Sequence, residues 1–207
     1  MRRALLIAVL ALAAAGCSLG DDGVGGEASA RERPAACPAA WKPGWQRLAD
    51  EVGIRVYCPS WMPSPIDAEI GGQWNSDGAI VDDDKSYLAG FLWHEAGSGD
   101  VHVNFRGYPG KTAIPSCIET RTSGGTVRRR AVPCFSDAKG TREVGGKAVT
   151  VYTVSRDADQ WHVTYAWRED GSLYTVSEHV APPLTFRQVL RNLDRIVGGL
   201  EGIDPKA

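Results

Sequence analysis

The sequence predicts an α+β domain in which an antiparallel β-sheet meander is covered by a C-terminal helix, with a short helix near the N-terminus. Three runs in the second half, 147–155, 160–168 and 172–180, alternate apolar and polar residues over strand lengths. Polar connections separate these runs at hairpin spacing. The last long run instead places its apolar residues at helical intervals. A sheet with one apolar face and a helix with one apolar stripe bury those surfaces against each other, which gives an α+β arrangement.

The first seventeen residues have the pattern of an export signal. Arg2 and Arg3 supply positive charge, and residues 4–15 are apolar or small. A helix of this length extends about 18 Å, which is short of the roughly 30 Å hydrocarbon core of a bilayer. The segment is therefore too short for an ordinary membrane span, and we expect residues 1–16 to be removed as a signal peptide.

The end of this segment, Ala14-Ala15-Gly16-Cys17, resembles the lipobox of bacterial lipoproteins. The resemblance covers the N-terminal segment alone, and Ala14 stands where that family most often has leucine. It implies that Cys17 receives a diacylglyceryl group and becomes the first residue of the mature chain, anchored to a membrane outside the cytoplasm. Two or more acyl chains give a stable anchor. The alternative is an ordinary cleaved signal in which Cys17 stays unmodified.

Residues 17–34 are predicted to be the lipidated cysteine and a disordered linker. The segment is rich in glycine, serine and acidic residues and has few hydrophobic ones. It therefore cannot bury enough apolar surface to offset the entropy of ordering. A flexible linker of this length spans about 20–25 Å. We expect residues 35–203 to form a single globular domain behind it.

The charge balance argues against nucleic acid as a partner. The chain has 23 lysines and arginines against 25 acidic residues, a formal charge of −2, and loss of Arg2 and Arg3 takes it to about −4. A chain without a basic excess has no long-range field that attracts nucleic acid.

The first half of the domain shows weaker patterns. Residues 45–52 have helical periodicity, with Gly53 as a stop, and 54–58 alternate as a strand. Prolines make the next stretch a constrained loop. Further strand-like runs lie at 68–74, 86–95 and 101–106, with 96–100 as a hairpin connection between the last two.

Four cysteines remain when Cys17 is set aside, and an even number in an exported chain indicates disulfides. Three connectivities are possible, and we expect the sequential one, Cys37–Cys58 and Cys117–Cys134. The first ties the start of the domain to an early strand, and the second closes a long loop or hairpin. Each contributes about 3 kcal/mol in the chain-entropy model. A metal site is the alternative, but no paired C-x-x-C spacing supports it.

The C-terminal helix is indicated by its start and by its apolar stripe. Thr185 and Gln188 fit a capping box, in which the two side chains satisfy backbone N–H groups at the helix start. Gly198-Gly199 marks its end. The stripe at helical spacing consists of Val189, Leu190, Leu193, Ile196, Val197 and Leu200.

Two short motifs resemble those of a family of uncharacterised bacterial envelope domains. They are the strand and loop 56–63 (VYCPSWMP) and the hairpin 167–174 (WREDGSLY), which precedes the helix at 185–200. The middle of the chain is unmatched. The resemblance implies an extracytoplasmic α+β module and carries over no catalytic residue.

No signature of known catalytic chemistry occurs in the sequence, so no catalytic residue, cofactor or metal is predicted. The histidines are His94, His102, His162 and His179. His102 and His162 fall on the polar faces of predicted strands, so they can meet across a sheet. With Glu95 nearby they form a conceivable zinc or copper site, whereas the simpler interpretation is scattered exposed histidines.

Three other groups have both a functional and a plain interpretation. Asp82-Asp83-Asp84 offers carboxylates to calcium or forms a solvated turn. Arg128-Arg129-Arg130, between two cysteines, contacts lipid phosphates or anionic wall polymers, or forms a solvated hairpin. The tryptophans form a ligand pocket or belong to the core.

The function expected from these observations is a binding or accessory module at the cell envelope, without enzymatic activity. The protein is expected outside the cytoplasm on a cell membrane, held by the lipid on Cys17 and contacting an envelope protein, wall polymer or lipid. The alternatives are an extracytoplasmic hydrolase with an unrecognised site and a carrier of a small ligand or metal.

Overall fold

The computed structural model describes residues 36–64, 66, 80–93, 101–154 and 161–206. All of them lie in one compact unit, Pro34–Ala207. The predicted signal peptide, Cys17, the linker 17–34 and the predicted strand 68–74 fall outside the described residues. So does the predicted connection 96–100.

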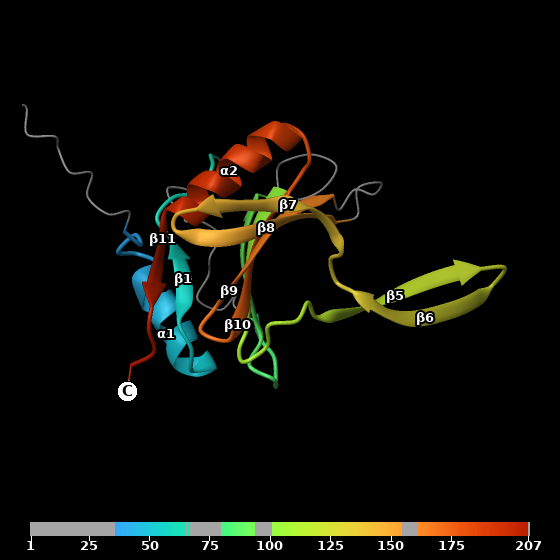
Figure 1. Cartoon of the computed structure of the whole chain (residues 1–207), viewed down its shortest axis with the longest axis horizontal. Helices are drawn as coiled ribbons and strands as arrows, with labels where there is room; N and C mark the ends of the chain where they lie inside the picture. The colour runs from blue at the N-terminus through green and yellow to red at the C-terminus, as the bar shows by residue number, and fades with distance from the viewer. Residues whose placement is uncertain (1–35, 65, 67–79, 94–100, 155–160, 207) are drawn as a thin grey trace, which may run out of the picture. The chain divides into compact units, whose positions relative to one another are not determined.

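The described residues form two helices and eleven strands, which confirms the α+β class (Figure 1). The predicted N-terminal helix is α1, and the predicted C-terminal helix is α2. In chain order the elements are α1 (Lys42–Val52), β1 (Val56–Pro59), β2 (Ile80–Val81), β3 (Tyr87–Trp93), β4 (Val101–Tyr108), β5 (Ser116–Ser123), β6 (Thr126–Pro133), β7 (Asp137–Val144), β8 (Lys147–Val154), β9 (His162–Glu169), β10 (Ser172–His179), α2 (Phe186–Gly198) and β11 (Leu200–Ile203).

The main sheet has seven strands in the order β2-β3-β4-β10-β9-β8-β7, and every neighbouring pair is antiparallel. The three strands predicted in the second half are β8, β9 and β10, and they form the expected meander. The polar strand β7 extends this meander by one strand, which the sequence did not indicate. On the other side β10 pairs with β4, so the meander 137–179 joins the earlier strands at the centre of the sheet.

A separate two-stranded sheet pairs β1 with β11, and Val56 lies opposite Ile203. Strand β11 was not predicted from the sequence. The predicted disulfide between Cys37 and Cys58 is present and joins the segment before α1 to β1, with a Cα–Cα distance of 5.5 Å. The backbone N–H of Cys37 also donates to the Glu201 side chain of β11 at 2.7 Å. The segment before α1 is therefore bound to both strands of this small sheet.

The C-terminal helix packs on the sheet at β7, β9 and β10, as expected from its apolar stripe (Figure 1). The predicted capping box is present: Thr185 accepts from the Gln188 backbone N–H, and the Gln188 side chain accepts from the Thr185 backbone N–H. At the sheet side, Arg142 of β7 donates to both carboxylate oxygens of Asp194 at 2.9 and 3.0 Å. The Tyr165 hydroxyl donates to the same carboxylate at 2.9 Å.

The face of the main sheet away from α2 is also partly covered, although the alternation of the strands predicts a polar face there. Phe135, Tyr152, Ala166 and Leu173 form a second buried cluster there, with Tyr108, Ile114, Cys134 and Val154 packed against it. The ring of Phe135 lies 4.8 Å from that of Tyr152. Phe135 and Ile114 come from irregular segments on either side of the β5–β6 hairpin, which explains why strand alternation did not indicate this cover.

One carboxylate lies inside the main core, between the sheet and α2. Glu178 of β10 is 0 % exposed, and its Oε1 accepts from the Asn192 side chain of α2 at 2.8 Å. Its Oε2 is buried without a hydrogen-bond partner among the described residues. Burial raises the pKa of Glu178 to about 8, and the Asn192 hydrogen bond opposes that increase only in part.

Candidate functional site

The most unusual feature of the described surface is the hairpin of β5 and β6. Its two strands are joined by Gly124-Gly125, whose φ values of +55° and +76° fit the left-handed positions of a tight two-residue turn. The strands pair only with each other and form a two-stranded sheet apart from the main one (Figure 1). Almost every side chain along both strands is exposed. The hairpin is therefore presented to solvent.

The base of the hairpin is covalently closed and packed against the domain. Cys117 and Cys134 form the predicted disulfide, with a Cα–Cα distance of 4.8 Å. Next to it the Cys134 backbone N–H donates to the Pro115 carbonyl at 2.9 Å. Cys134 and Phe135 also belong to the second buried cluster. The hairpin thus starts from a fixed base, although its own strands are not covered.

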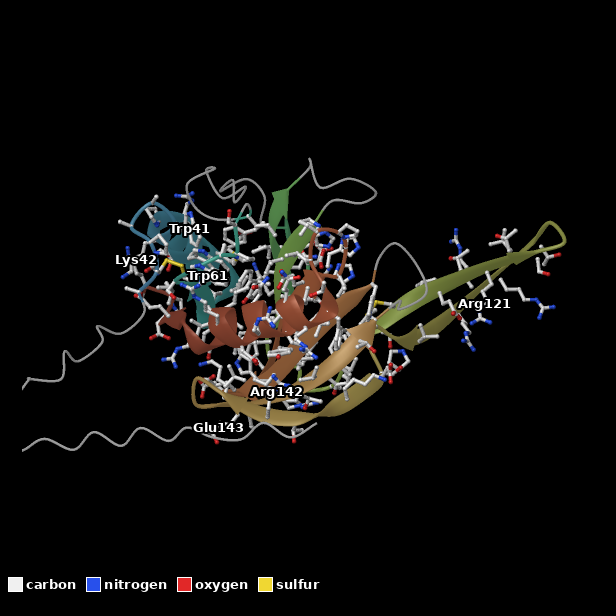
Figure 2. All side chains as sticks on the ribbon, turned by 90° about the horizontal axis from the view of Figure 1, so that it is seen from above. Trp41, Lys42, Trp61, Arg121, Arg142 and Glu143 are labelled. Carbon is white, nitrogen blue, oxygen red and sulfur yellow. A yellow bond between two sulfur atoms is a disulfide. The ribbon has the colours of Figure 1, made fainter. Side chains whose placement is uncertain are left out.

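One face of the hairpin is charged. Side chains alternate between the two faces of a strand, so Glu119, Arg121, Arg128 and Arg130 share a face. Arg121 lies directly opposite Arg128, and Glu119 lies opposite Arg130. Figure 2 shows Arg121 on this hairpin, where side chains stand away from both of its faces.

Glu119 is the acidic partner on this charged face. It accepts from Arg121 at 2.9 Å and from Arg130, and the two guanidinium groups lower the pKa of its carboxyl. Arg128 forms no ion pair with any other described residue. Like charges placed directly across a strand pair are destabilising. The Arg121–Arg128 pair is therefore not explained by the stability of the hairpin.

The opposite face of the hairpin is largely uncharged. Ile118 lies opposite Ala131, and Val127 lies opposite Thr122. Ile118 is 65 % exposed and Val127 is 55 % exposed, and they are the exposed large hydrophobic side chains of the described chain. Only Arg129 adds a charge to this face. Exposed apolar residues gathered on one element indicate a contact surface more strongly than the same residues scattered singly.

Charge is also segregated onto this hairpin. Between Ser116 and Pro133 the chain has four arginines and one glutamate, which is a formal charge of +3. The whole chain carries −2, so the remainder carries −5. The predicted basic segment 128–130 is thus part of a larger basic element, completed by Arg121 from the other strand. Ile118 and Val127 were not among the predicted site residues, although strand alternation about a Gly-Gly turn places both on one face.

Three of the four histidines meet on the face of the main sheet away from α2, the face that also carries the second buried cluster. His102 of β4, His179 of β10 and His162 of β9 lie on three neighbouring strands, and their ring centroids are 4.8 to 5.2 Å apart. The Nε2 atoms of His102 and His162 are 2.7 Å apart, a hydrogen-bond distance. The expectation that these two histidines meet across the sheet is confirmed. The participation of His179 depends on the β4–β10 pairing, which local sequence patterns do not reveal.

This histidine cluster, His102, His162 and His179, does not complete a metal centre within the described chain. No group of three or more histidine, cysteine, aspartate or glutamate residues has a metal-binding arrangement there. His94 and Glu95, which the sequence analysis considered as further ligands, lie outside the described residues. The cluster is a set of packed imidazoles, of which His179 is buried.

The remaining sequence candidates have structural roles where they are described. Asp82, Asp83 and Asp84 form an exposed turn, in which Asp84 accepts from the Ser86 backbone at 2.9 Å and pairs with Lys111. The Lys111 side chain is the main reason that the pKa of Asp84 lies well below its usual range. Trp41, Trp45 and Trp167 are buried in the main core, as the plain interpretation expected. Trp61 is partly buried and stacks under Arg195, with 3.9 Å between the guanidinium carbon and the ring centroid.

Neither described helix is long and apolar enough to cross a membrane. No protein-family model, curated protein or solved structure matches the chain.

Proposed function

We propose that this protein is a membrane-anchored extracytoplasmic lipoprotein without enzymatic activity, which contacts an envelope partner through its β5–β6 hairpin. The proposal joins two parts. The lipobox-like segment ending at Cys17 supplies the anchor, and the linker 17–34 lets the domain reach partners near the membrane surface. The hairpin supplies the contact element.

The observation that carries the contact role is the composition of the hairpin. It holds the exposed large hydrophobic residues of the described chain, Ile118 and Val127, together with a net positive charge in a chain that is otherwise negative. These side chains contribute nothing to the described core. A disulfide at the base restricts the hairpin before binding, and restriction of this kind lowers the entropy lost on association. A surface with these properties is suited to binding.

Two disulfides support the extracytoplasmic part of the proposal. Cys37–Cys58 and Cys117–Cys134 use all the cysteines after Cys17. Disulfides persist in oxidising compartments and are rare in the reducing cytosol. Because the four cysteines pair among themselves, Cys17 remains available for modification by lipid.

The contact role is tested by photo-crosslinking in intact cells. A photoreactive amino acid replaces Thr122, which lies opposite Val127 on the exposed hairpin, and in a second chain it replaces Glu51, an exposed residue of α1. We expect a discrete adduct from position 122 and none of the same mass from position 51. Equal adducts from both positions, or none from position 122, would overturn the contact role.

The anchor is tested separately by mass spectrometry of the membrane fraction. The expected mature N-terminus is Cys17 with a diacylglyceryl group, and Cys17→Ser is expected to release the protein from the membrane. An unmodified Cys17 in the mature protein would show that the proposed anchor is wrong. The crosslinking test of the contact role would not be affected by that result.

A further inference from the structure

We propose that the charged face of the hairpin, Arg121, Arg128 and Arg130 with Glu119, binds the phosphate groups of an anionic phospholipid surface. This inference rests on the proposed function, because it names the partner of the same hairpin. It commits to the bilayer, the surface to which the lipid anchor would hold the domain.

The arrangement of the arginines provides the first argument. Arg121 and Arg128 are directly opposite each other, and side chains in such pairs have Cβ atoms about 4.5–5.5 Å apart. Arg130 lies two residues further along on the same face, about 7 Å away. Two guanidinium groups this close repel each other unless an anion lies between them. A phosphate accepts hydrogen bonds from both, which turns an unfavourable pair into a binding site.

The choice of cation provides the second argument. All four positive residues between Ser116 and Pro133 are arginines. The planar guanidinium group binds phosphate with two parallel hydrogen bonds and is less strongly hydrated than the lysine ammonium group. Glu119 neutralises one positive charge on the face, so three arginines and one glutamate leave a surplus of two. That surplus matches a surface of many singly charged headgroups.

The shape of the element provides the third argument. A two-stranded ribbon with exposed side chains along its whole length has no enclosed site for a single small anion. It presents its arginines in a row, which suits a repeating layer of phosphates. Once Arg2 and Arg3 are removed, the rest of the chain carries −7 and is repelled by the same layer, so the charge distribution orients the domain with this hairpin toward the lipid.

The expected strength agrees with a tethered role. Each unit of basic charge near an anionic membrane enriches the protein there about fivefold, so the surplus of two charges gives about 25-fold at low salt. For a freely diffusing protein this enrichment is weak. For a domain already held near the bilayer by its anchor, the same interaction is intramolecular, and the high effective concentration makes it sufficient to set orientation.

The test uses the chain from Ser18 onward, without lipid, so that binding reports the hairpin and not the anchor. The unit Pro34–Ala207 contains the described core and both disulfides and is expected to fold in an oxidising compartment. Partition is measured by co-sedimentation with vesicles of phosphatidylcholine, with and without about 30 % phosphatidylglycerol. We expect about 25-fold stronger partition onto the anionic vesicles near 50 mM salt, and nearly none of that gain near 500 mM salt.

Two variants with the same change in charge isolate the hairpin. Arg121→Ser, Arg128→Ser and Arg130→Ser together are expected to abolish the preference for anionic vesicles. The control changes three exposed helical arginines, Arg47→Ser, Arg187→Ser and Arg191→Ser, and is expected to reduce partition less than twofold. Equal losses in both variants would refute a localised site, and an unchanged hairpin variant would refute the inference outright.

Vesicle binding and crosslinking together distinguish a lipid surface from free phosphate and from a protein partner. Inorganic phosphate at matched ionic strength is expected to leave vesicle binding unchanged, and displacement by it would show a site for the free anion instead. If vesicles do not bind but the position 122 crosslink to a protein persists, the lipid inference fails and the proposed contact role stands. If both fail, the hairpin is not the contact element.

Discussion

The buried carboxylate Glu178 leads to a prediction about how stability depends on pH. Its side chain is 0 % exposed, and burial raises its pKa from 4.5 to about 8. In the unfolded chain the group returns to the ordinary value. Between these two pKa values the folded state therefore binds a proton that the unfolded state does not. The contribution of Glu178 is fully favourable below about pH 4.5 and is progressively lost as the pH rises toward 8.

The size of this effect follows from the two pKa values. Each pH unit between them changes the free energy of unfolding by about 1.4 kcal/mol. The penalty carried by Glu178 is then about 1 kcal/mol at pH 5 and about 3 kcal/mol at pH 7. Glu178→Gln keeps the shape of the side chain and an oxygen for the Asn192 hydrogen bond, but it does not titrate. As the pH rises from 5 to 7, the free energy of unfolding of this variant is therefore expected to increase by about 2 to 3 kcal/mol relative to that of the parent.

The assay is urea unfolding followed by tryptophan fluorescence at pH 5, 6, 7 and 8, with the free energy of unfolding compared between parent and Glu178→Gln. Taking the difference cancels the contribution of carboxylates with lowered pKa, such as Glu201 and Asp204, because both proteins contain them. Glu51→Gln, at an exposed helical position, is the control and is expected to follow the parent at every pH. A difference between parent and Glu178→Gln that does not change with pH would refute the reasoning.

Three further predictions concern the packing of α2 and its neighbours and are tested by denaturant unfolding. Leu193→Ala removes a fully buried side chain from α2 and is expected to cost about 2–5 kcal/mol; a loss below 1 kcal/mol would contradict its place in the core. Gly145→Ala is expected to destabilise more than Gly146→Ala. Both glycines have positive φ, but a Cβ at 145 would lie 2.8 Å from the Gly198 Cα, whereas one at 146 meets nothing; equal losses would contradict the close approach. Thr185→Ala is expected to cost about 1 kcal/mol through loss of the helix cap, with Thr185→Ser close to the parent; equal stability of the Ala and Ser variants would contradict the capping role.

The elements that could be predicted from the sequence are those specified by neighbouring residues. The capping box and the apolar stripe of α2 lie within one short segment, and each strand of 147–179 carries its own alternation. Strand β7 could not be predicted because its side chains are mostly exposed, so its sequence has no apolar alternation. Strand β11 could not be predicted because four residues after Gly198-Gly199 are too few to show a period.

The candidate site was predicted only in part because its remaining features depend on which strands pair and in which register. The cysteine count indicated the closed hairpin, and the arginine run indicated its charge. That Arg121 faces Arg128 follows from the register, which the turn position fixes. That His179 joins His102 follows from the pairing of β10 with β4, which are far apart in the chain. No periodicity within a strand contains that information.

The pairing of β1 with β11 has a consequence for the order in which the chain completes its fold. Val56 pairs with Ile203, which is 147 positions later, whereas Cys37 and Cys58 are only 21 positions apart. The first disulfide can therefore form long before β11 is in place. Contacts of long range in the sequence are slow to form. The corner formed by β1 and β11 is therefore expected to close late in folding.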